Sequence, residues 1–517
     1  MTRYGFVIDQ RRCIGCHACT VACKSENQVP LGSFRTWVKY IEKGEFPNTR
    51  RYFAVERCQH CEKPPCVEIC PTWALFKRRD GIVDFDSERC IGCKSCMQAC
   101  PYDALYIDPA SHTAAKCHYC AHRTDRGLLP ACVIVCPTRA IIAGDLEDPR
   151  SEIAQTLARQ PVQVRRPDQG TRPQVFYVGA DETAMTPGLA AQPTTYMWAQ
   201  LGPAGADLEP KGSVWSLAGV TRAPGGAARA VTVYDVPHQK PWGWRVAAYL
   251  WTKSVAAGTL LVGVPLAALG LATASLTLAA GLVAMLFTLL TVVLLVWDLK
   301  RPDRCWRVVL KPNPRSWLVR GAYILAAYGA VTALVTLTAL LGWEPGLRLL
   351  VWPAALLAAA TAGYSAFLFG QAEGRDFWQS PMLLWHLLAG AVEAGAAALL
   401  LVTATIAPGE GLQPLLGAVL LTAILATGAL ALGEVYSPHG NKDVATAAAL
   451  LKRGPLARRF QTGFLLAGVG LPTFVLAITL PGGLPAGTAV SAALLALAGL
   501  WTYEDLWIRA GQSVPMS

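Results

Sequence analysis

The stretch "CIGCHACTVAC", residues 13–23, places four cysteines at spacings of two, two and three intervening residues. Related runs follow as "CQHCEKPPCVEIC" at 58–70, "CIGCKSCMQAC" at 90–100, and "CHYC" at 117–120 with a delayed "CVIVC" at 132–136. These four motifs hold every one of the 17 cysteines except Cys305. The fold of this region therefore depends on what these groups of four cysteines bind or form.

Three kinds of chemistry use cysteines in such groups. Disulfide frameworks belong mainly to short secreted chains, whereas this chain has 517 residues and its first residues, "MTRYGFVIDQRR", show no apolar signal core. Structural zinc takes two separated CxxC pairs, and zinc explains neither the CxxCxxCxxxC spacing nor the proline after the fourth cysteine. In the bacterial ferredoxin motif, which has this spacing, the fourth cysteine ligates the cluster of a partner motif. We therefore expect Cys23 to ligate an iron–sulfur cluster built around another motif.

Residues 1–145 resemble the four-cluster electron-transfer subunit of molybdopterin oxidoreductases of the dimethyl sulfoxide reductase type. The resemblance implies that the first motif pairs with the fourth and the second with the third, which defines four cysteine quartets. Quartet 1 is Cys13, Cys16, Cys19 and Cys136; quartet 2 is Cys23, Cys117, Cys120 and Cys132; quartet 3 is Cys58, Cys61, Cys66 and Cys100; quartet 4 is Cys70, Cys90, Cys93 and Cys96. Some relatives carry an aromatic residue and a three-iron cluster in the third motif, but Cys96 is present here. We expect four [4Fe–4S] clusters.

Basic residues lie beside these cysteines in the sequence, namely Arg11, Arg12, Lys24, Lys63 and Lys94. Positive charge near a cluster favours its reduced, more negative form. A solvated basic surface is the simpler interpretation, and the sequence alone does not decide between the two.

Composition changes after residue 145. Residues 146–241 are rich in proline, glycine and alanine, as in "RRPDQGTRPQ" (165–174) and "TRAPGGAARA" (221–230), and show no sustained periodicity. This composition predicts a linker. Because a structureless run of this length is uncommon, we expect part of it to be ordered against a partner.

From residue 242 the chain is a series of apolar segments, each near the ~20 residues that span a bilayer as a helix. We predict them at 246–271, 274–297, 318–341, 347–370, 382–406, 412–435, 461–481 and 485–508. The predicted fold is multidomain. An α+β domain of the double bacterial-ferredoxin type covers 1–145, the linker covers 146–241, and an all-α bundle of eight transmembrane helices covers 242–517.

Lysines and arginines in the loops predict the orientation of the bundle. The loops on the N-terminal side hold Lys300, Arg301, Arg304, Arg307, Lys311, Arg315, Arg320, Arg375, Lys442, Lys452, Arg453, Arg458, Arg459 and Arg509, whereas the opposite side holds Arg348 alone. This bias predicts a cytoplasmic iron–sulfur domain on a bacterial or archaeal inner membrane. It also accounts for much of the net charge of +11, so nucleic-acid binding is not expected.

Residues 242–510 resemble the NrfD-like membrane subunit of polysulfide reductase-type complexes, which exchange electrons with quinone. The matching segments are "WGWRVAAYLWTKSVAAG" (242–258), "DLKRPDRCWRVVLKPNPRSW" (298–317) and "GYSAFLFGQAEGRDFW" (363–378). Two polypeptides that are usually separate are joined here. The resemblance places the second and third motifs nearer the membrane, which makes quartet 4 the expected exchange point with quinone.

Polar residues inside membrane helices are candidates for the quinone site. Arg245, Tyr249 and Lys253 are four apart and share one face of the first helix. By the resemblance, Arg245 and Tyr249 match the quinone-contacting pair, and Tyr364 matches the tyrosine of the fourth helix. Interfacial snorkelling is the alternative interpretation, and it suits Arg245 better than Lys253.

Three further polar residues lie within predicted helices. His386 and Glu393 are seven apart on the fifth helix, and Glu434 lies on the sixth. They are candidates for a proton path or, equally, structural residues with satisfied hydrogen bonds. A haem with two histidine ligands is not expected, because His386 and His439 are the only histidines after residue 240.

These patterns predict an electron-transfer and membrane-anchor subunit of a respiratory molybdenum or tungsten oxidoreductase. It would link a molybdopterin-type catalytic subunit on a separate, cytoplasmic chain to menaquinone or ubiquinone in the membrane lipid. The alternative is a redox-coupled ion-translocating module, which the buried Lys253, His386 and Glu393 would serve.

Overall fold

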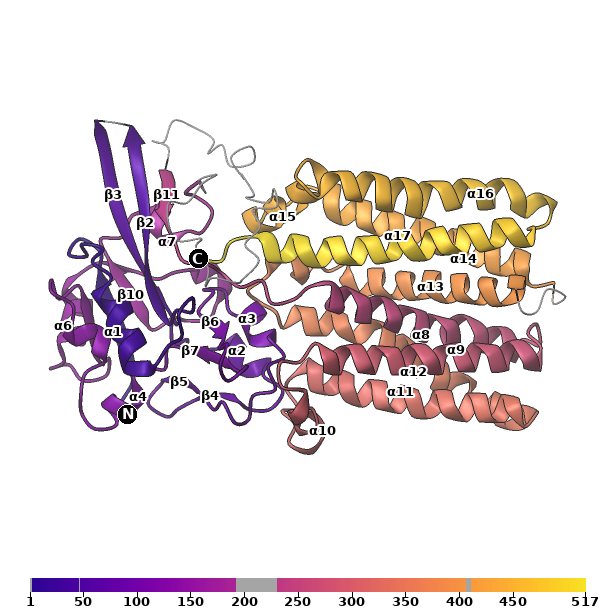
Figure 1. The fold of residues 1–517 in the computed structure, drawn as a ribbon, viewed down its shortest axis with the longest axis horizontal. Coiled ribbons are helices and arrows are strands. Elements are labelled where there is room, and N and C mark those ends of the chain that lie inside the picture. The colour runs from indigo at the N-terminus through magenta and orange to yellow at the C-terminus, as the bar shows by residue number, and fades with distance from the viewer. Residues whose placement is uncertain (1, 46, 192–229, 406–410) are drawn as a thin grey trace. The chain divides into compact units, whose positions relative to one another are not determined.

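The computed structural model describes residues 2–45, 47–191, 230–405 and 411–517, which form two compact units (Figure 1). The first unit runs to Pro241 and also takes in Ala372–Arg375 and Val514–Ser517. The second unit consists of Trp242–Gln371 and Asp376–Ser513. The cysteine motifs all lie in the first unit and the long apolar segments in the second.

The cysteine motifs of the first unit share one local design, a tight loop followed by a short helix. The helices are α1 (Ala18–Asn27), α2 (Pro65–Glu68), α3 (Ser95–Ala99), α4 (Ala121–Thr124) and α5 (Ala131–Ile134). In each loop the residue before the second cysteine has positive φ: Gly15 (70°), His60 (43°), Gly92 (67°) and Tyr119 (61°). Glycine adopts this conformation readily, while His60 and Tyr119 are held by packing and hydrogen bonds. The Tyr119 hydroxyl, for example, donates to the Gly5 carbonyl at 2.7 Å.

Two sheets and two small ribbons frame these loops (Figure 1). In the first sheet β1 (Tyr4–Asp9) lies between β8 (Ile141–Asp145), which is antiparallel, and β10 (Val175–Val178), which is parallel and also pairs with β9 (Val162–Gln163). In the second, β2 (Thr36–Glu45) pairs with β3 (Asn48–Arg57) and with β11 (Ala230–Tyr234). The ribbons are β4 (Leu75–Lys77) with β5 (Val83–Phe85), and β6 (Leu105–Ile107) with β7 (Ala114–Lys116).

The predicted linker differs from what the structure shows. Residues 146–191 and 230–241 belong to the first unit, where they supply α6 (Glu152–Arg159), α7 (Glu182–Met185) and the strands β9, β10 and β11. Val175 and Ile153 are completely buried in its core. The strands are short, and β10 and β11 pair with β1 and β2, which lie far away in the sequence, so local periodicity could not reveal them. The remaining part of the predicted linker, 192–229, lies outside the described residues.

The second unit is a bundle of long helices. Among the described residues, eight helices are long and apolar enough to cross a membrane. They are α8 (Trp244–Ala268), α9 (Ala274–Trp297), α11 (Trp317–Leu340), α12 (Glu344–Gly370), α13 (Leu383–Thr405), α14 (Gln413–Tyr436), the span Arg459–Gly482, and α17 (Ala486–Ser513). The seventh span combines the π-helical segment η5 (Arg459–Gly470) with α16 (Leu471–Thr479) and η6 (Leu480–Gly482). The predicted eight helices are confirmed, although the end predicted at residue 406 lies outside the described residues.

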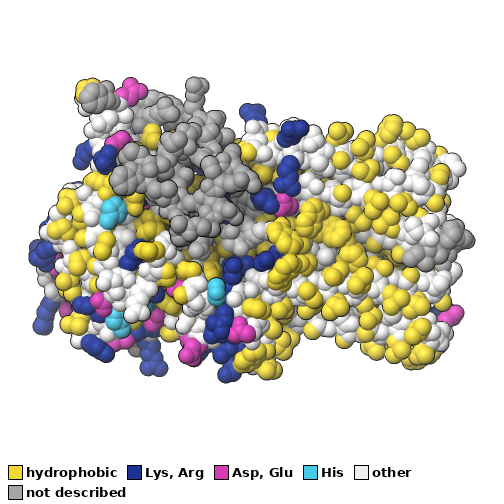
Figure 2. All heavy atoms as spheres, viewed as in Figure 1, with side chains coloured by type: hydrophobic (Ala, Val, Ile, Leu, Met, Phe, Trp, Pro, Cys, Tyr) yellow, Lys and Arg dark blue, Asp and Glu magenta, His cyan; other side chains and the backbone are white. Residues whose placement is uncertain are grey.

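The surface of the bundle suits a lipid environment. Side chains such as Leu289, Leu349, Trp352 and Phe474 are exposed. Figure 2 shows hydrophobic and uncharged atoms along the length of the visible helices, with scarcely any charged side chain between their ends. The short helices α10 (Arg307–Leu310) and α15 (Lys442–Lys452) and the turns η3 (Pro302–Arg304) and η4 (Asp376–Gln379) lie in its loops.

Small residues bring the helices of the bundle close together. A Cβ atom on Gly258 of α8 would lie 1.7 Å from the Ala391 carbonyl oxygen of α13, and one on Gly395 would lie 2.0 Å from the Gly258 carbonyl carbon. Gly468 and Gly499 bring η5 and α17 together in the same way. Such backbone proximity is typical of membrane helix pairs, in which van der Waals packing drives association.

Candidate functional site

The structure brings cysteines from different motifs together around cavities. One cavity is lined by all four cysteines of quartet 2, so Cys23 of the first motif lies with three cysteines of the fourth. A second cavity is lined by all four cysteines of quartet 3, and a third by all four of quartet 4. Each grouping therefore takes three cysteines from one motif and one from another.

Quartet 1 lies closer to the surface. Cys16 is exposed, Cys13 and Cys136 are half-buried, and Cys19 is buried. Cys13, Cys19 and Cys136 pack into one apolar cluster, and the Cys13 thiol interacts electrostatically with those of Cys16 and Cys136.

Burial affects the ionisation of several of these thiols. It raises the pKa of Cys19 to about 11, and the pKa values of Cys93 and Cys100 to about 12. Because the thiolate is the form that binds metal, positive charge must be supplied for these side chains to ionise. Backbone N–H groups also point at the sulfur atoms: Ala140 N–H donates to Cys136 Sγ at 3.2 Å, and Gly92 N–H to Cys90 Sγ at 3.4 Å. Four sulfur donors around each cavity fit a [4Fe–4S] cluster.

The basic residues noted in the sequence occupy different environments. Arg11, Arg12 and Lys63 are exposed, and Arg11 pairs with Asp9 at 2.8 Å. Lys24 is half-buried and donates to the carbonyls of Pro30 and Ser33. Lys94 is buried and lines the cavity of quartet 4. A solvated surface therefore describes three of the five.

Lys253 of α8 and Tyr364 of α12 lie together in the interior of the bundle. Lys253 is completely buried, and its Nζ donates to Ser365 Oγ at 2.6 Å and to the Ala362 carbonyl at 3.0 Å. The same Nζ lies 4.7 Å from the centroid of the Tyr364 ring. Gly321 of α11 leaves room for that ring, because a Cβ there would lie 2.3 Å from one of its carbon atoms.

The other two residues on this face of α8 separate. Tyr249 is buried, one turn before Lys253. Arg245 is half-buried, and its guanidinium lies 4.6 Å from the Trp297 ring and 5.7 Å from the Trp244 ring. Stacking on tryptophans near the end of a span is the environment of an interfacial residue. The structure therefore places Tyr249, Lys253 and Tyr364 in the interior and Arg245 at its margin.

His386 and Glu434 meet through a residue that the sequence analysis did not single out. The Tyr503 hydroxyl of α17 donates to Glu434 Oε2 at 2.7 Å, and the Tyr503 ring lies 4.5 Å from that of His386. Within the described residues, neither ring nitrogen of His386 has a hydrogen-bond partner, and Glu434 Oε1 has none either. Glu393 accepts a hydrogen bond from Thr427 of α14.

Glu504, the next residue of α17, is a further buried acid that the sequence analysis missed. Its side chain is 4% exposed, and it interacts electrostatically with Lys253 and with Glu393. Glu504 therefore couples electrostatically to two residues that the sequence had named separately. The sequence does contain a signal for Glu504, because it is an acidic residue inside a predicted membrane span.

Comparisons with known proteins agree with this division of the chain. A family model described as "Polysulphide reductase, NrfD" matches residues 232–515, more than half of the chain. A 4Fe-4S dicluster domain model matches 49–146, and a 4Fe-4S binding domain model matches 11–28.

Several curated proteins resemble the N-terminal part. One tetrathionate reductase subunit, from Salmonella typhimurium, is 47% identical over 199 residues, which cover 38% of this chain and 80% of that protein. One polysulfide reductase polypeptide, from Wolinella succinogenes, is 42% identical over 181 residues, 34% of this chain and 94% of that protein. One selenate reductase subunit, from Mesobacillus selenatarsenatis, is 38% identical over 205 residues, 33% of this chain and 70% of that protein. With its iron–sulfur domain and its eight-helix bundle in one polypeptide, the chain belongs to the NrfD polysulphide reductase family.

Proposed function

We propose that this chain passes electrons between a catalytic subunit on a separate chain and membrane quinone, through four [4Fe–4S] clusters held by quartets 1 to 4. Electron transfer and membrane anchoring follow from its iron–sulfur and NrfD domains. The catalytic partner is a cytoplasmic molybdopterin-type enzyme containing molybdenum or tungsten, and the quinone is menaquinone or ubiquinone. The iron–sulfur relatives named for reductases of tetrathionate, polysulfide and selenate support such a partner.

The observation that carries this proposal is the pairing of cysteines around the cavities. Quartets 2, 3 and 4 each line one cavity with sulfur donors from two motifs. This is the arrangement that the ferredoxin spacing requires, since its fourth cysteine serves the partner cluster. When bound, each cluster supplies a one-electron carrier, and the chain's thiolates, N–H donors and buried cations hold it and set its potential.

The quinone site of this proposal is built around Tyr249, Lys253 and Tyr364. A quinone needs hydrogen-bond donors for its carbonyl oxygens and an apolar slot for its ring. The two hydroxyls and the ammonium of Lys253 are such donors, and the surrounding helices are apolar. Arg245, stacked on tryptophans, is assigned to the mouth of the site. Quartet 4 is the proposed exchange point with quinone.

Metal analysis of the anaerobically purified chain tests the cluster proposal. Four tetranuclear clusters require about sixteen irons per chain. Replacing Cys23 by Ser should damage the cluster built on Cys117, Cys120 and Cys132 and leave the cluster of quartet 1 intact. The matched variant Cys305→Ser, outside the motifs, should keep all of its iron. Stoichiometric zinc without iron, or loss of the quartet 1 signal in Cys23→Ser, would contradict the proposal.

A second candidate function is redox-coupled ion translocation. The observation that favours it is that three buried ionisable residues interact electrostatically, Glu504 of α17 with Lys253 of α8 and with Glu393 of α13. Such residues are costly in a membrane protein and usually mark ion or proton paths. Proton or sodium uptake by vesicles during quinone reduction, abolished by an uncoupler or ionophore and lost in Glu504→Gln, would establish it. Unchanged uptake in Glu504→Gln would exclude these three residues as the path.

A further inference from the structure

Each of the four cysteine motifs is directly preceded by a basic residue, but these four residues have different environments. Arg12 precedes Cys13 and Arg89 precedes Cys90, and both side chains are exposed; Arg89 pairs with Asp86 at 2.9 Å. Arg57 precedes Cys58 and Lys116 precedes Cys117, and both are 0% exposed. A charge buried in a protein interior is strongly destabilising unless an opposite charge compensates it.

Arg57, the last residue of β3, contacts a sulfur atom, a hydroxyl and an aromatic ring. Its Nη1 donates to Cys132 Sγ of quartet 2 at 3.5 Å, and its Nη2 donates to Thr36 Oγ1 at 3.2 Å. The guanidinium lies 4.4 Å from the Phe6 ring, lines the cavity of quartet 2, and also interacts with the Cys19 thiol of quartet 1. Throughout the described part of the chain, no carboxylate pairs with it. The adjacent Glu56 pairs with Arg165 instead.

Lys116, the last residue of β7, has an equivalent position beside quartets 2 and 3. Its Nζ donates to the carbonyls of Cys117, at 2.9 Å, and of Val83. The ammonium interacts electrostatically with the Cys58 and Cys66 thiols of quartet 3. Over residues 2–45, 47–191, 230–405 and 411–517, no carboxylate is paired with Lys116 either.

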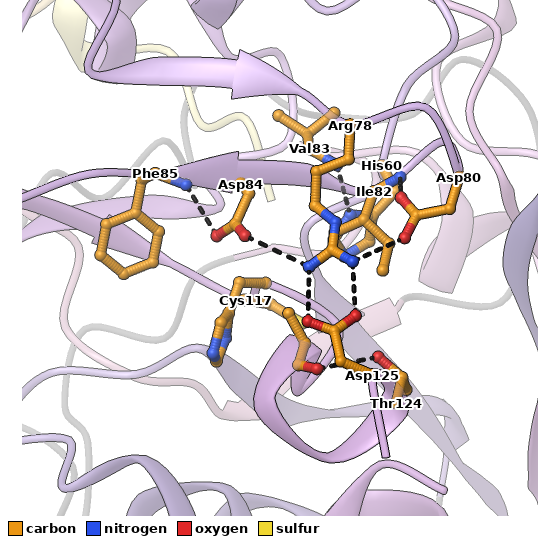
Figure 3. Close-up of polar contacts among 12 residues, drawn as sticks. His60, Arg78, Asp80, Ile82, Val83, Asp84, Phe85, Cys117, Thr124 and Asp125 are labelled. Carbon is orange, nitrogen blue, oxygen red and sulfur yellow. Dashed lines mark hydrogen bonds and ion pairs between the residues drawn. The ribbon is translucent and has the colours of Figure 1, made fainter. Parts of the chain in front are cut away.

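Neighbouring groups do not neutralise these two cations. His60 interacts with both, yet its Nδ1 accepts the Val83 N–H at 3.2 Å, and burial lowers the pKa of its ring. Arg78 differs from Arg57 and Lys116 in its partners, because it lies among carboxylates (Figure 3). It is 25% exposed and lies 2.9 Å from Asp80 and 2.5 Å from Asp125. Arg78 is balanced by acids, whereas Arg57 and Lys116 face cysteine sulfur atoms, which carry negative charge when they ligate a cluster.

We propose that Arg57 and Lys116 are buried counter-charges shared between neighbouring cluster sites, Arg57 between quartets 1 and 2 and Lys116 between quartets 2 and 3. This inference rests on the proposed four-cluster function. A cation in a low-dielectric interior stabilises the more negative, reduced form of an adjacent cluster and raises its reduction potential. Quartet 4 gains no such effect from Arg89, because water and Asp86 screen that side chain.

Redox titration of the full chain, followed by electron paramagnetic resonance, tests the assignment. Arg57→Gln should lower two of the four midpoint potentials, and Lys116→Gln should lower two, with one potential common to both variants. Arg57→Lys keeps the charge and should stay closer to wild type. Arg12→Gln and Arg89→Gln, which remove exposed basic residues at the equivalent sequence position, should leave all four potentials in place.

Iron content separates failure of this inference from failure of the proposed function. Wild-type chain without about sixteen irons would overturn the four-cluster function itself. Full iron in Arg57→Gln and Lys116→Gln with unchanged potentials, or shifts no larger than those of Arg12→Gln, would overturn the shared counter-charges alone. If Arg57→Gln loses iron, the Arg57→Lys variant distinguishes a role of charge from a role in packing. Retained iron and near wild-type potentials in Arg57→Lys would support the role of charge. Iron loss equal to that of Arg57→Gln would assign Arg57 to packing and overturn the proposal.

Discussion

Tyr364 and Tyr249 are the residues on which the proposed quinone site can be tested most directly. Replacing either by Phe removes a hydroxyl and leaves the ring that packs in the bundle. One hydrogen bond contributes about 0.5–1.5 kcal/mol, so electron transfer to quinone should slow by roughly twofold to tenfold. The measurement is quinone reduction by the dithionite-reduced chain, followed optically at several quinone concentrations.

A matched control is Tyr328→Phe. Tyr328 is also buried in the bundle, but its hydroxyl already donates to the Ala256 carbonyl at 2.6 Å. That variant should lose some thermal stability and keep its quinone kinetics. Iron content should be unchanged in all three variants. Wild-type kinetics and inhibitor sensitivity in both Tyr249→Phe and Tyr364→Phe would move the site elsewhere, with Lys253 and Glu393 the next residues to replace.

His238 makes the stability of the first unit depend on pH. Burial alone would lower the pKa of His238, but the carboxylates of Asp235 and Asp103 more than offset burial and raise it to about 10. Its Nδ1 lies 2.6 Å from Asp103 Oδ2. Because the folded-state pKa exceeds the unfolded value of about 6.5, the stabilisation is fully present below that value and is lost as pH rises through about 10.

The pH effect is best measured as a difference between two proteins. The melting temperature of the wild-type first unit should exceed that of His238→Gln at pH 7, and the difference should shrink steadily toward pH 11. Lysines and tyrosines also titrate in this pH range, but they do so in both proteins, so their effects cancel in the difference between the two melting temperatures. A difference independent of pH would show that His238 contributes through packing and not through its charge.

At the scale of elements, the contact between α8 and α13 depends on two glycines. Gly258 and Gly395 face each other's backbone, so an added Cβ would meet main-chain atoms, which cannot rotate away. Gly258→Ala or Gly395→Ala should therefore force the helices apart and destabilise the bundle by about 1–3 kcal/mol. Thermal unfolding of the detergent-solubilised chain measures this loss.

Gly370 provides the matched control for that prediction. It ends α12, and a Cβ placed there would meet no atom of the described residues within 4 Å apart from the adjacent backbone of its own helix. Gly370→Ala should leave stability unchanged or raise it slightly, since alanine restricts the unfolded chain more than glycine does. Equal stability of all three alanine variants would show that α8 and α13 tolerate a wider separation than this packing indicates.

At the scale of the whole molecule, the distribution of lysine and arginine predicts how the chain lies in its membrane. Loops on the N-terminal side of the bundle hold nearly all of these residues, so a reporter fused after Ser517 should be active only in the cytoplasm. Alkaline phosphatase and green fluorescent protein fusions at this position distinguish a periplasmic from a cytoplasmic C-terminus. Alkaline phosphatase activity at that position would reverse the orientation and the proposed cytoplasmic location of the catalytic partner.

Much of the architecture follows from the sequence because its signals are local. The CxxCxxCxxxC spacing sets up tight loops with a left-handed residue before the second cysteine, as at Gly15 and Gly92. Hydrophobic segments long enough to cross a bilayer indicated the membrane helices, and α9 begins and ends at the predicted residues. Both signals are complete within about twenty residues, so no distant contact is needed to recognise them.

Other features depend on contacts between distant residues. The strand β10 was hidden in a predicted linker because its partner β1 lies more than 160 residues earlier. Glu504 gained significance only when α17 packed beside the helices that carry Lys253 and Glu393. Arg12 and Arg57 occupy the same place before a cysteine, yet one is exposed and the other buried against Cys132. The sequence by itself determined the cysteine motifs and the membrane spans, because ligand spacing and hydropathy are properties of short segments. Only the tertiary structure decided which charges are buried and which groups face them, because burial and electrostatic partners depend on neighbours brought together by folding.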